Sequence, residues 1–224
     1  MIISHEHKII FLKTKKVAGT SFEMALSKFC GPDCIITPIS PVDEKERTLL
    51  GFRPSQNYLE KDRVGVGVTG HPNCNIRGDF ANHDTAEKIF HQISDEMFND
   101  YLKISIYRNP LDFLISYYYF YMRNLPDANR VPFKYWVANN HHRIKENYQI
   151  APETGPYAAD IIMQYENIDS EIMKLDRLPS GFVDLFFRLN AKGNFRDAKS
   201  RNTYEFYMEN GFTEQELKFL RNVK

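Results

Sequence analysis

The chain has 224 residues, of which 42% are hydrophobic and 14% aromatic, so it can bury one sizeable core. Its 29 basic and 29 acidic residues cancel, which leaves no global field to gather nucleic acid or an anionic membrane. No apolar run reaches the roughly 18 residues of a membrane span, and polar residues 5–8 stand where a signal peptide would be apolar. We therefore predict one soluble, cytoplasmic domain over residues 1–224, with no nucleic-acid or membrane partner.

The first strong pattern is a strand, a basic turn and a helix start. The apolar residues 9–12 predict a strand, residues 13–16 (KTKK) form the turn, and a helix opens at Thr20 and Ser21, just after Gly19. Backbone N–H groups at a helix start are unpaired and carry the positive end of the helix dipole. The stretch therefore predicts a site for a phosphate or sulfate group. It is not a Walker A loop, because its lysines precede the glycine.

The region after this helix is harder to interpret. The helix is expected to end near residue 31, and residues 34–37 predict a short strand. Residues 38–62 are polar and aperiodic, which is typical of a surface segment that contributes to an acceptor pocket. Residues 64–69 alternate valine with glycine and predict a second strand. Asp84 and Glu87 have the spacing of a helix cap, so a helix is expected just after His83.

The second half of the chain has further apolar patterns that predict strands and helices. Further strands are expected at residues 101–107 and 160–165, and further helices at residues 109–123, 133–139, 168–175 and 182–189. A last helix begins at Thr213, which forms a capping box with Glu216. Strands that alternate with helices predict an α/β fold in which a central parallel sheet is flanked by helices.

A second anion motif follows the strand at residues 101–107. Arg108 ends that strand, Asn109 and Pro110 begin the next helix, and Ser116 stands eight residues after the arginine. Asn109 and Ser116 lie on one helix face, separated by about 10 Å of rise. Arg108 can fold its guanidinium back along that face toward the serine hydroxyl, and a guanidinium fork suits a phosphate dianion. Both basic junctions are expected at the carboxyl ends of strands, where such sheets bind ligands.

Together the two motifs resemble those of the sulfotransferases that use 3'-phosphoadenosine 5'-phosphosulfate (PAPS). The family's 5'-phosphosulfate loop usually reads Pro-Lys-Thr-Ala-Gly-Thr-Ser; residues 16–21 follow it, with Lys15 replacing proline and Val17 replacing threonine. Its 3'-phosphate signature has the same arginine, Asn-Pro and serine. Residues 115–120 (ISYYYF) also resemble heparan sulfate 2-O-sulfotransferases. The resemblance covers residues 11–26 and 101–121 well and implies a P-loop-like three-layer fold. Because eukaryotic relatives are often anchored, a chain without a membrane anchor suggests a bacterial or viral form, or a trimmed chain.

The resemblance implies in-line transfer of a sulfuryl group from PAPS to a hydroxyl of a small-molecule or oligosaccharide acceptor, with a saccharide favoured. By match to the family, Lys16 would stabilise the departing product PAP, the loop would cradle the 5'-phosphate, and Arg108 with Ser116 would hold the 3'-phosphate. The residues implied for donor binding are Lys16, Val17, Ala18, Gly19, Thr20, Ser21, Arg108 and Ser116. The basic residues 192–201 fall where the family often closes over the nucleotide.

The general base has two candidates. His83 precedes a helix start whose positive end would favour the neutral imidazole, and His71 in Gly-His-Pro resembles the Gly-His of the 2-O-sulfotransferases. We favour His83, although neither histidine need be the base, because surface and capping histidines are common. No metal is required by this scheme. Cys30, Cys34 and Cys74 with His71 have no standard zinc spacing, and their odd number favours reduced thiols.

Two other functions remain open from the sequence. A P-loop kinase would share the fold, but it would need the Walker A order and a magnesium carboxylate, which are not evident here. A catalytically silent protein that binds a nucleotide or a sulfated glycan would keep the fold without turnover. Calorimetry with PAP and ATP separates the first two functions, and turnover of labelled PAPS separates an enzyme from a silent binder.

Overall fold

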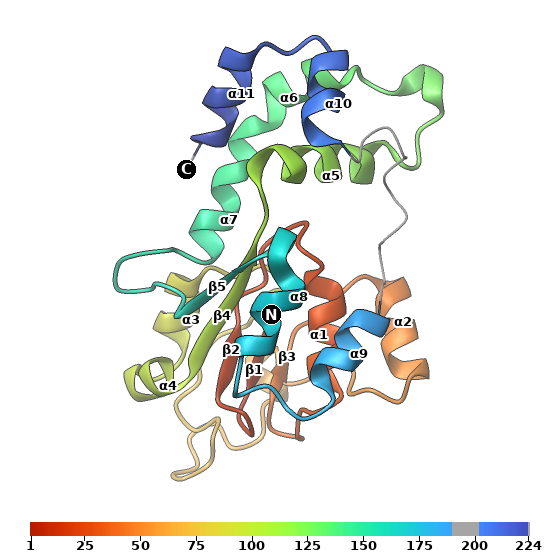
Figure 1. Cartoon of the computed structure of the whole chain (residues 1–224). Helices are drawn as coiled ribbons and strands as arrows, with labels where there is room; N and C mark the ends of the chain where they lie inside the picture. The colour runs from red at the N-terminus through yellow and green to blue at the C-terminus, as the bar shows by residue number, and fades with distance from the viewer. Residues whose placement is uncertain (190–201, 224) are drawn as a thin grey trace.

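The computed structural model describes residues 1–189 and 202–223 (Figure 1). Its centre is a sheet of five strands in the order β3–β1–β2–β4–β5. The strands are β1 (Ile2–Ser4), β2 (Ile9–Phe11), β3 (Ile35–Ile36), β4 (Leu102–Tyr107) and β5 (Ile161–Gln164). The parallel pairs are β2 with β4 and β4 with β5, whereas β1 runs antiparallel to both of its neighbours. The fold is therefore mixed α/β with a mostly parallel sheet.

The antiparallel β1 corrects the expectation of a purely parallel sheet. Residues 5–8 form a tight turn between β1 and β2, and a turn that short can join only antiparallel neighbours. The strand at residues 2–4 is not recognisable from the sequence, because three apolar residues are too few for a periodicity to show. The expected strands at residues 9–12, 34–37, 101–107 and 160–165 are confirmed.

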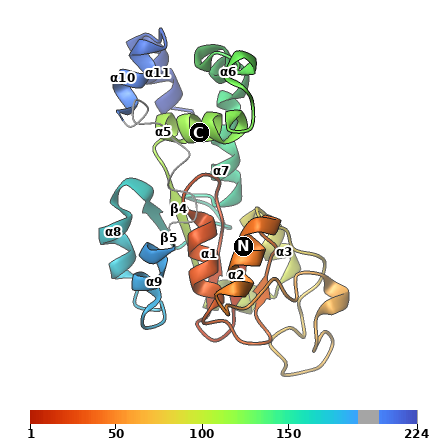
Figure 2. The ribbon, with the colours of Figure 1, turned by 90° about the vertical axis from the view of Figure 1, so that its right-hand side faces the viewer.

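Helices cover both faces of the sheet (Figures 1 and 2). Alternate side chains of β2 point to opposite faces, so Ile9 and Phe11 belong to one apolar cluster and Ile10 to another. On the first face lie α1 (Gly19–Ser27), α8 (Ile168–Glu171) and α9 (Phe182–Arg188), and on the second lie α3 (Ala86–Gln92) and α4 (Asp95–Asp100). Phe11 stacks on Phe22 of α1 with ring centroids 4.1 Å apart. These contacts fix α1 against the strand that leads into it.

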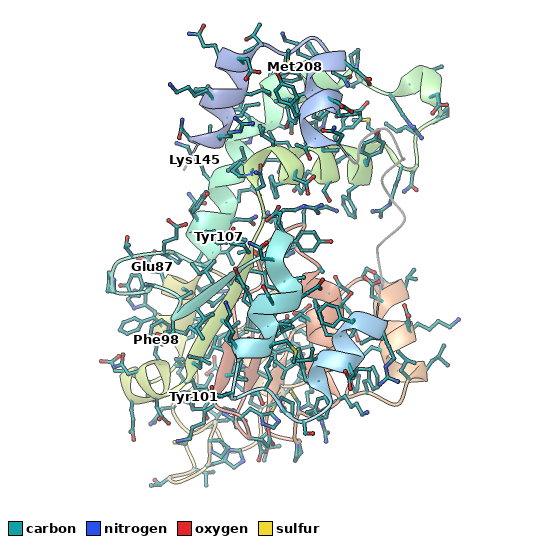
Figure 3. All side chains as sticks on the ribbon, in the orientation of Figure 1. Glu87, Phe98, Tyr101, Tyr107, Lys145 and Met208 are labelled. Carbon is teal, nitrogen blue, oxygen red and sulfur yellow. The ribbon has the colours of Figure 1, made fainter. Side chains whose placement is uncertain are left out.

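A second group of helices, the helical layer, lies beyond the carboxyl end of β4. It contains α5 (Pro110–Met122), α6 (Phe133–Asn140), α7 (Ile144–Ile150), α10 (Thr203–Glu209) and α11 (Glu214–Arg221). Figure 3 labels Tyr101 and Tyr107 at the two ends of β4 and shows that Tyr107 is the end facing this layer. The layer has its own aromatic core, in which Phe133 contacts Phe206 and Tyr207 with ring centroids 4.9 and 5.1 Å apart. The helical layer thus has its own core and covers the carboxyl end of β4.

The remaining elements are short or peripheral. They are α2 (Pro41–Leu49) and the 3-10 turns Glu60–Asp62, Asp127–Asn129, His141–Arg143, Tyr165–Asn167 and Ile172–Lys174. In the described part of the chain, no helix has the length and apolar character needed to cross a membrane. The single domain over residues 1–224 stays a prediction.

Several helix predictions are confirmed, including those beginning near residues 20, 109, 133, 168 and 182. The helix after His83 begins slightly later than expected, because Thr85 and not Asp84 is its cap and accepts a hydrogen bond from the Lys88 N–H over 3.1 Å. The capping box of Thr213 and Glu216 is present at α11. The basic residues 192–201, with Arg201, lie outside the described residues.

Two predictions are wrong. Residues 64–69 form turns and not a strand, with the side chains of Val64 and Val68 72% and 59% exposed, so no sheet neighbour buries them. Residues 38–62 are not uniformly irregular, since α2 begins after Ser40, whose hydroxyl accepts from the Asp43 N–H. The helix α7 was also missed, because its polar sequence carries a weak apolar pattern.

Candidate functional site

A pocket of about 900 Å³ lies between the basic loop, the end of β4 and α5. We call residues 13–21 the anion loop. Every residue that the family resemblance implies for donor binding lines this pocket, and so does His83. His71 does not line it. Lys16 and Arg108 are 92 residues apart in the sequence, and the parallel pairing of β2 with β4 brings the two motifs to one edge of the sheet.

The anion loop has an unusual backbone. Lys16 and Ala18 have φ values of +62° and +58°, a region that side chains other than glycine disfavour at a cost of order 1 kcal/mol each. Ala18 is also the N-cap of α1, and it has no side-chain oxygen to bind the first N–H groups of that helix. No acidic residue stands in the first turn of α1 either. This helix start is therefore suited to an anion.

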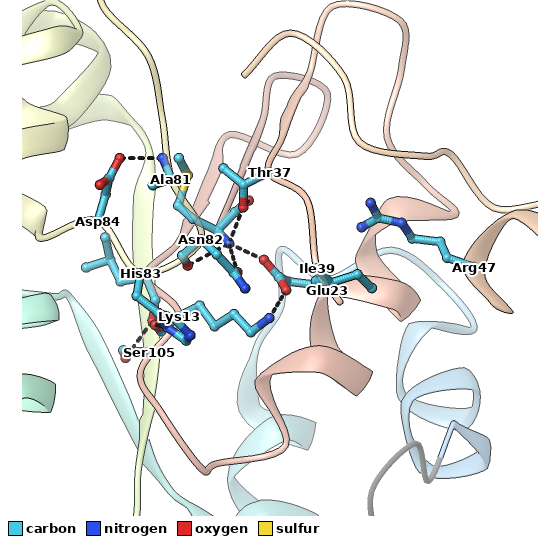
Figure 4. A network of polar contacts seen from close by, with 12 residues as sticks. Lys13, Glu23, Thr37, Ile39, Arg47, Ala81, Asn82, His83, Asp84 and Ser105 are labelled. Carbon is cyan, nitrogen blue, oxygen red and sulfur yellow. Dashed lines mark hydrogen bonds and ion pairs between the residues drawn. The ribbon is translucent and has the colours of Figure 1, made fainter. Parts of the chain in front are cut away.

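The three lysines of the anion loop have different environments. Lys13 is buried and its ammonium pairs with the buried carboxylate of Glu23 on α1 (Figure 4). Lys15 pairs with the half-buried Glu146 of α7. The Lys16 ammonium lies over the ring of Phe120, 4.0 Å from its centroid, in the pocket wall formed by α5. Among the three, Lys16 is the lysine whose position suits a bound anion.

A glycine is required at position 19 because the side chain of Lys13 passes close to its Cα atom. A Cβ atom built on Gly19 would lie 2.8 Å from Cγ of Lys13, closer than such atoms approach in proteins. The lysine stem crosses the start of α1 to reach Glu23, so a side chain at this position would displace it. The glycine therefore permits a buried ion pair that ties the end of β2 to α1.

Arg108 is held on three sides. Its Nε donates to the carboxylate of Asp112, its Nη1 donates to the backbone carbonyl of Lys16 over 3.0 Å, and its guanidinium stacks on Tyr165 at 4.4 Å. Such a preorganised fork loses little freedom when it binds phosphate. The two anion motifs are thus in direct contact.

The partner of Arg108 differs from the one expected. The spacing in the sequence predicts its guanidinium against the hydroxyl of Ser116, but the structure places it against Asp112, one helical turn closer. A carboxylate four residues along the helix is a stronger partner for arginine than a neutral hydroxyl. Ser116 still lines the pocket from the next turn of α5. Asp112 also accepts from the hydroxyl of Thr203 on α10 over 3.0 Å.

His83 is oriented by a backbone contact. Its Nδ1 lies 2.7 Å from the carbonyl oxygen of Lys13 (Figure 4), and a carbonyl can only accept, so Nδ1 carries the proton. The other ring nitrogen, Nε2, then has a lone pair. Burial lowers the pKa of His83 from 6.5 to about 4, with the nearby charge of Lys13 acting in the same direction. The imidazole is therefore neutral at pH 7, for a reason other than the helix dipole that the sequence analysis proposed.

His71 has a structural environment. Its Nδ1 accepts from the Asn73 N–H over 3.1 Å, and its Nε2 lies 3.4 Å from a carboxylate oxygen of Asp33. Cys30, Cys34 and Cys74 are free thiols. Within residues 1–189 and 202–223, no group of three or more histidines, cysteines or carboxylates is arranged to hold a metal ion.

Some residues around the pocket were not recognised from the sequence. Asp112 and its arginine have the spacing of a helical ion pair, which could have revealed it. Asn147 of α7 contacts the anion loop, yet nothing in its local sequence indicates this role. Thr203, Tyr204 and Arg221 reach the pocket wall from α10 and α11.

The chain was compared with protein families, curated proteins and solved structures. Residues 1–177 match the family described as "Sulfotransferase family", a span that includes the anion loop, His83, Arg108 and Ser116. No curated protein and no solved structure matches significantly. The match covers well over half of the chain and contains both anion motifs. The chain therefore belongs to the sulfotransferase family.

Proposed function

We propose that the protein transfers a sulfuryl group from PAPS to a hydroxyl of an acceptor, with a saccharide as the favoured acceptor class, on a P-loop-like three-layer fold. The observation that carries the proposal is the contact between the two anion motifs, in which Arg108 donates to the carbonyl of Lys16 inside one pocket. A nucleotide with phosphates on its 3' and 5' positions can reach both motifs at once.

The pocket suits such a donor in charge and in shape. The start of α1, which has no capping side chain, would receive the 5'-phosphate through the backbone N–H groups of residues 18–21, with the hydroxyls of Thr20 and Ser21 close by. Arg108 and Ser116 would receive the 3'-phosphate. PAPS supplies a sulfuryl group that is already activated by its bond to phosphate. The protein needs to position this group and to neutralise the charge that develops on the leaving oxygen.

Lys16 and His83 would act on the reacting atoms. The Lys16 ammonium would stabilise the negative charge of the departing phosphate oxygen. His83 Nε2 would accept the proton of the acceptor hydroxyl, since Nδ1 is engaged with the Lys13 carbonyl. That carbonyl would then stabilise the imidazolium in its orientation. The low pKa of His83 keeps the imidazole in the accepting form at neutral pH.

Binding and turnover test the proposal in two steps. Calorimetry without added metal should show binding of PAP and none of ATP, because ATP has no 3'-phosphate for Arg108. Incubation with labelled PAPS and a panel of saccharides and other alcohols should then transfer label to an acceptor. Binding of ATP in preference to PAP would support a kinase, and PAP binding without turnover on any acceptor would indicate a silent binder.

A further inference from the structure

The anion loop departs from the usual family sequence at Lys15, where proline is common. Proline fixes its own φ near −65° and has no N–H group. Lysine at this position has a free φ and an N–H that needs an acceptor. The residue that follows, Lys16, adopts a left-handed conformation with φ +62°. Lys15, whose φ is not fixed by a ring, therefore stands directly before the left-handed Lys16.

One side chain of the helical layer contacts both polar groups of Lys15. The Lys15 N–H donates to Asn147 Oδ1 over 2.7 Å, and Asn147 Nδ2 donates to the Lys15 carbonyl over 3.2 Å. Asn147 lies on α7 and is only 7% exposed. The carboxamide therefore pairs with this residue as a neighbouring strand would, although α7 is a helix.

These contacts restrain Lys16 from one side, and Arg108 restrains it from the other. The carbonyl of Lys15 belongs to the peptide that precedes Lys16, so the bond from Asn147 limits rotation about φ of Lys16. The carbonyl of Lys16 belongs to the peptide that follows, and Arg108 Nη1 donates to it over 3.0 Å. The peptide groups before and after Lys16 are thus each held by a hydrogen bond from a side chain.

We propose that Asn147 is a positioning residue for the anion loop, and that its two hydrogen bonds to Lys15 hold the peptide before the left-handed Lys16, in a loop where the usual family sequence has a proline at residue 15. As far as it concerns donor binding, the inference rests on the proposed function. Asn147 does not need to touch the donor. It holds the backbone so that the Lys16 ammonium and the N–H groups after it meet the anion without reordering.

The neighbouring ion pair does not explain the same restraint. Glu146 pairs with the Lys15 ammonium, but both side chains are about one quarter exposed, and such pairs contribute little because water screens them. This pair also acts at the end of a long flexible side chain and leaves the backbone free. The restraint therefore comes from the amide of Asn147.

The test is a double-mutant cycle between residues 15 and 147. Asn147→Ala should weaken PAP binding and raise KM for PAPS about tenfold, since two hydrogen bonds to the loop are lost, with a smaller change in kcat. Lys15→Pro in the Asn147→Ala background should restore PAP binding to within about threefold of wild type. Proline fixes φ of residue 15, directly before the peptide that Asn147 holds, and it has no N–H group that needs an acceptor. A double variant as weak as the product of the two single variants would overturn the inference.

A control and a second readout keep the result interpretable. Asn139→Ala removes an exposed amide of α6 that donates to the Tyr135 carbonyl of the same helix, and should leave PAP affinity unchanged. Amide hydrogen exchange without ligand should be faster at residues 16–18 in Asn147→Ala and slower again in the double variant. Unchanged exchange in a folded Asn147→Ala would contradict the inference. If wild-type protein failed to bind PAP, the proposed function would fail while the exchange result would still judge Asn147.

Discussion

Two of the loops that contain left-handed residues differ in which contacts hold those residues. In the anion loop the left-handed residues are Lys16 and Ala18, whereas in residues 64–71, the valine–glycine loop, they are the glycines at 65, 67 and 70. Glycine adopts this conformation without strain. The anion loop instead relies on contacts from α5 and α7, and its strained residues face a pocket. Of these two loops, only the one that lines the pocket has left-handed residues other than glycine, although Lys8 and Asn57 adopt this conformation elsewhere.

The same contrast separates the two candidate histidines. His83 lies on the pocket beside the anion loop, and His71 closes the valine–glycine loop away from it. His83→Gln should lower turnover by roughly 10²–10⁴-fold, the usual contribution of a general base, and should leave PAP affinity nearly unchanged. The matched variant His71→Gln should retain turnover within about twofold. The reverse ranking would exchange the roles of the two histidines, and full turnover in both variants would exclude both.

The pH dependence sharpens this comparison. Because burial lowers the pKa of His83 to about 4, the neutral form persists from pH 8 down to about pH 5. The kcat/KM of the wild type should therefore stay level over that range and fall below it, as His83 takes up a proton. A fall that began near pH 6.5 would show an imidazole with an ordinary pKa, in conflict with its buried environment.

Lysine substitutions compare the anion loop with the segment just before the valine–glycine loop. Lys16→Ala should lower turnover of labelled PAPS by about 10²–10³-fold, because the charge on the leaving oxygen loses its partner. Lys61→Ala, an exposed lysine shortly before the valine–glycine loop, should have no measurable effect. Turnover of Lys16→Ala at the wild-type rate would remove this lysine from the catalytic assignment.

Arg108 tests the link between the anion loop and α5. Arg108→Lys removes the rigid fork and its contact with the Lys16 carbonyl. The preference for PAP over 5'-AMP, measured by calorimetry, should shrink about tenfold, since 5'-AMP has no 3'-phosphate to lose. Arg77→Lys, at an exposed arginine beyond the valine–glycine loop, is the matched control. An unchanged preference would place the 3'-phosphate elsewhere.

Glycine substitutions give the smallest expected effects. Gly19→Ala should lower the free energy of unfolding by about 1–3 kcal/mol, because the new methyl group meets the Lys13 stem. Gly67→Ala should cost about 1 kcal/mol through its φ of +79° alone, since no atom lies within 4 Å of the added Cβ. Denaturant unfolding measures both losses. PAP affinity should fall only in Gly19→Ala, and an equal fall in both variants would contradict the difference between the loops.

Local signals in the sequence predicted much of the fold and several residues that line the pocket. The anion loop, Arg108 and Ser116 stand at strand-to-helix junctions, and such junctions of parallel strands meet in space by necessity. The antiparallel β1 and the polar helix α7 could not be predicted, because their residues carry too little periodicity. Asn147 acts through contacts that only the folded chain creates, whereas the four-residue spacing of Arg108 and Asp112 could be recognised in the sequence. The valine–glycine loop was misread because alternation alone does not show whether a neighbouring strand exists.

The central claim is that the two anion motifs bind opposite ends of one nucleotide, and a crystal structure with PAP tests it most directly. We expect the 5'-phosphate at residues 16–21 and the 3'-phosphate at Arg108 and Ser116, with His83 Nε2 facing the side where the sulfuryl group would be. PAP bound through only one motif, or outside the pocket, would contradict it.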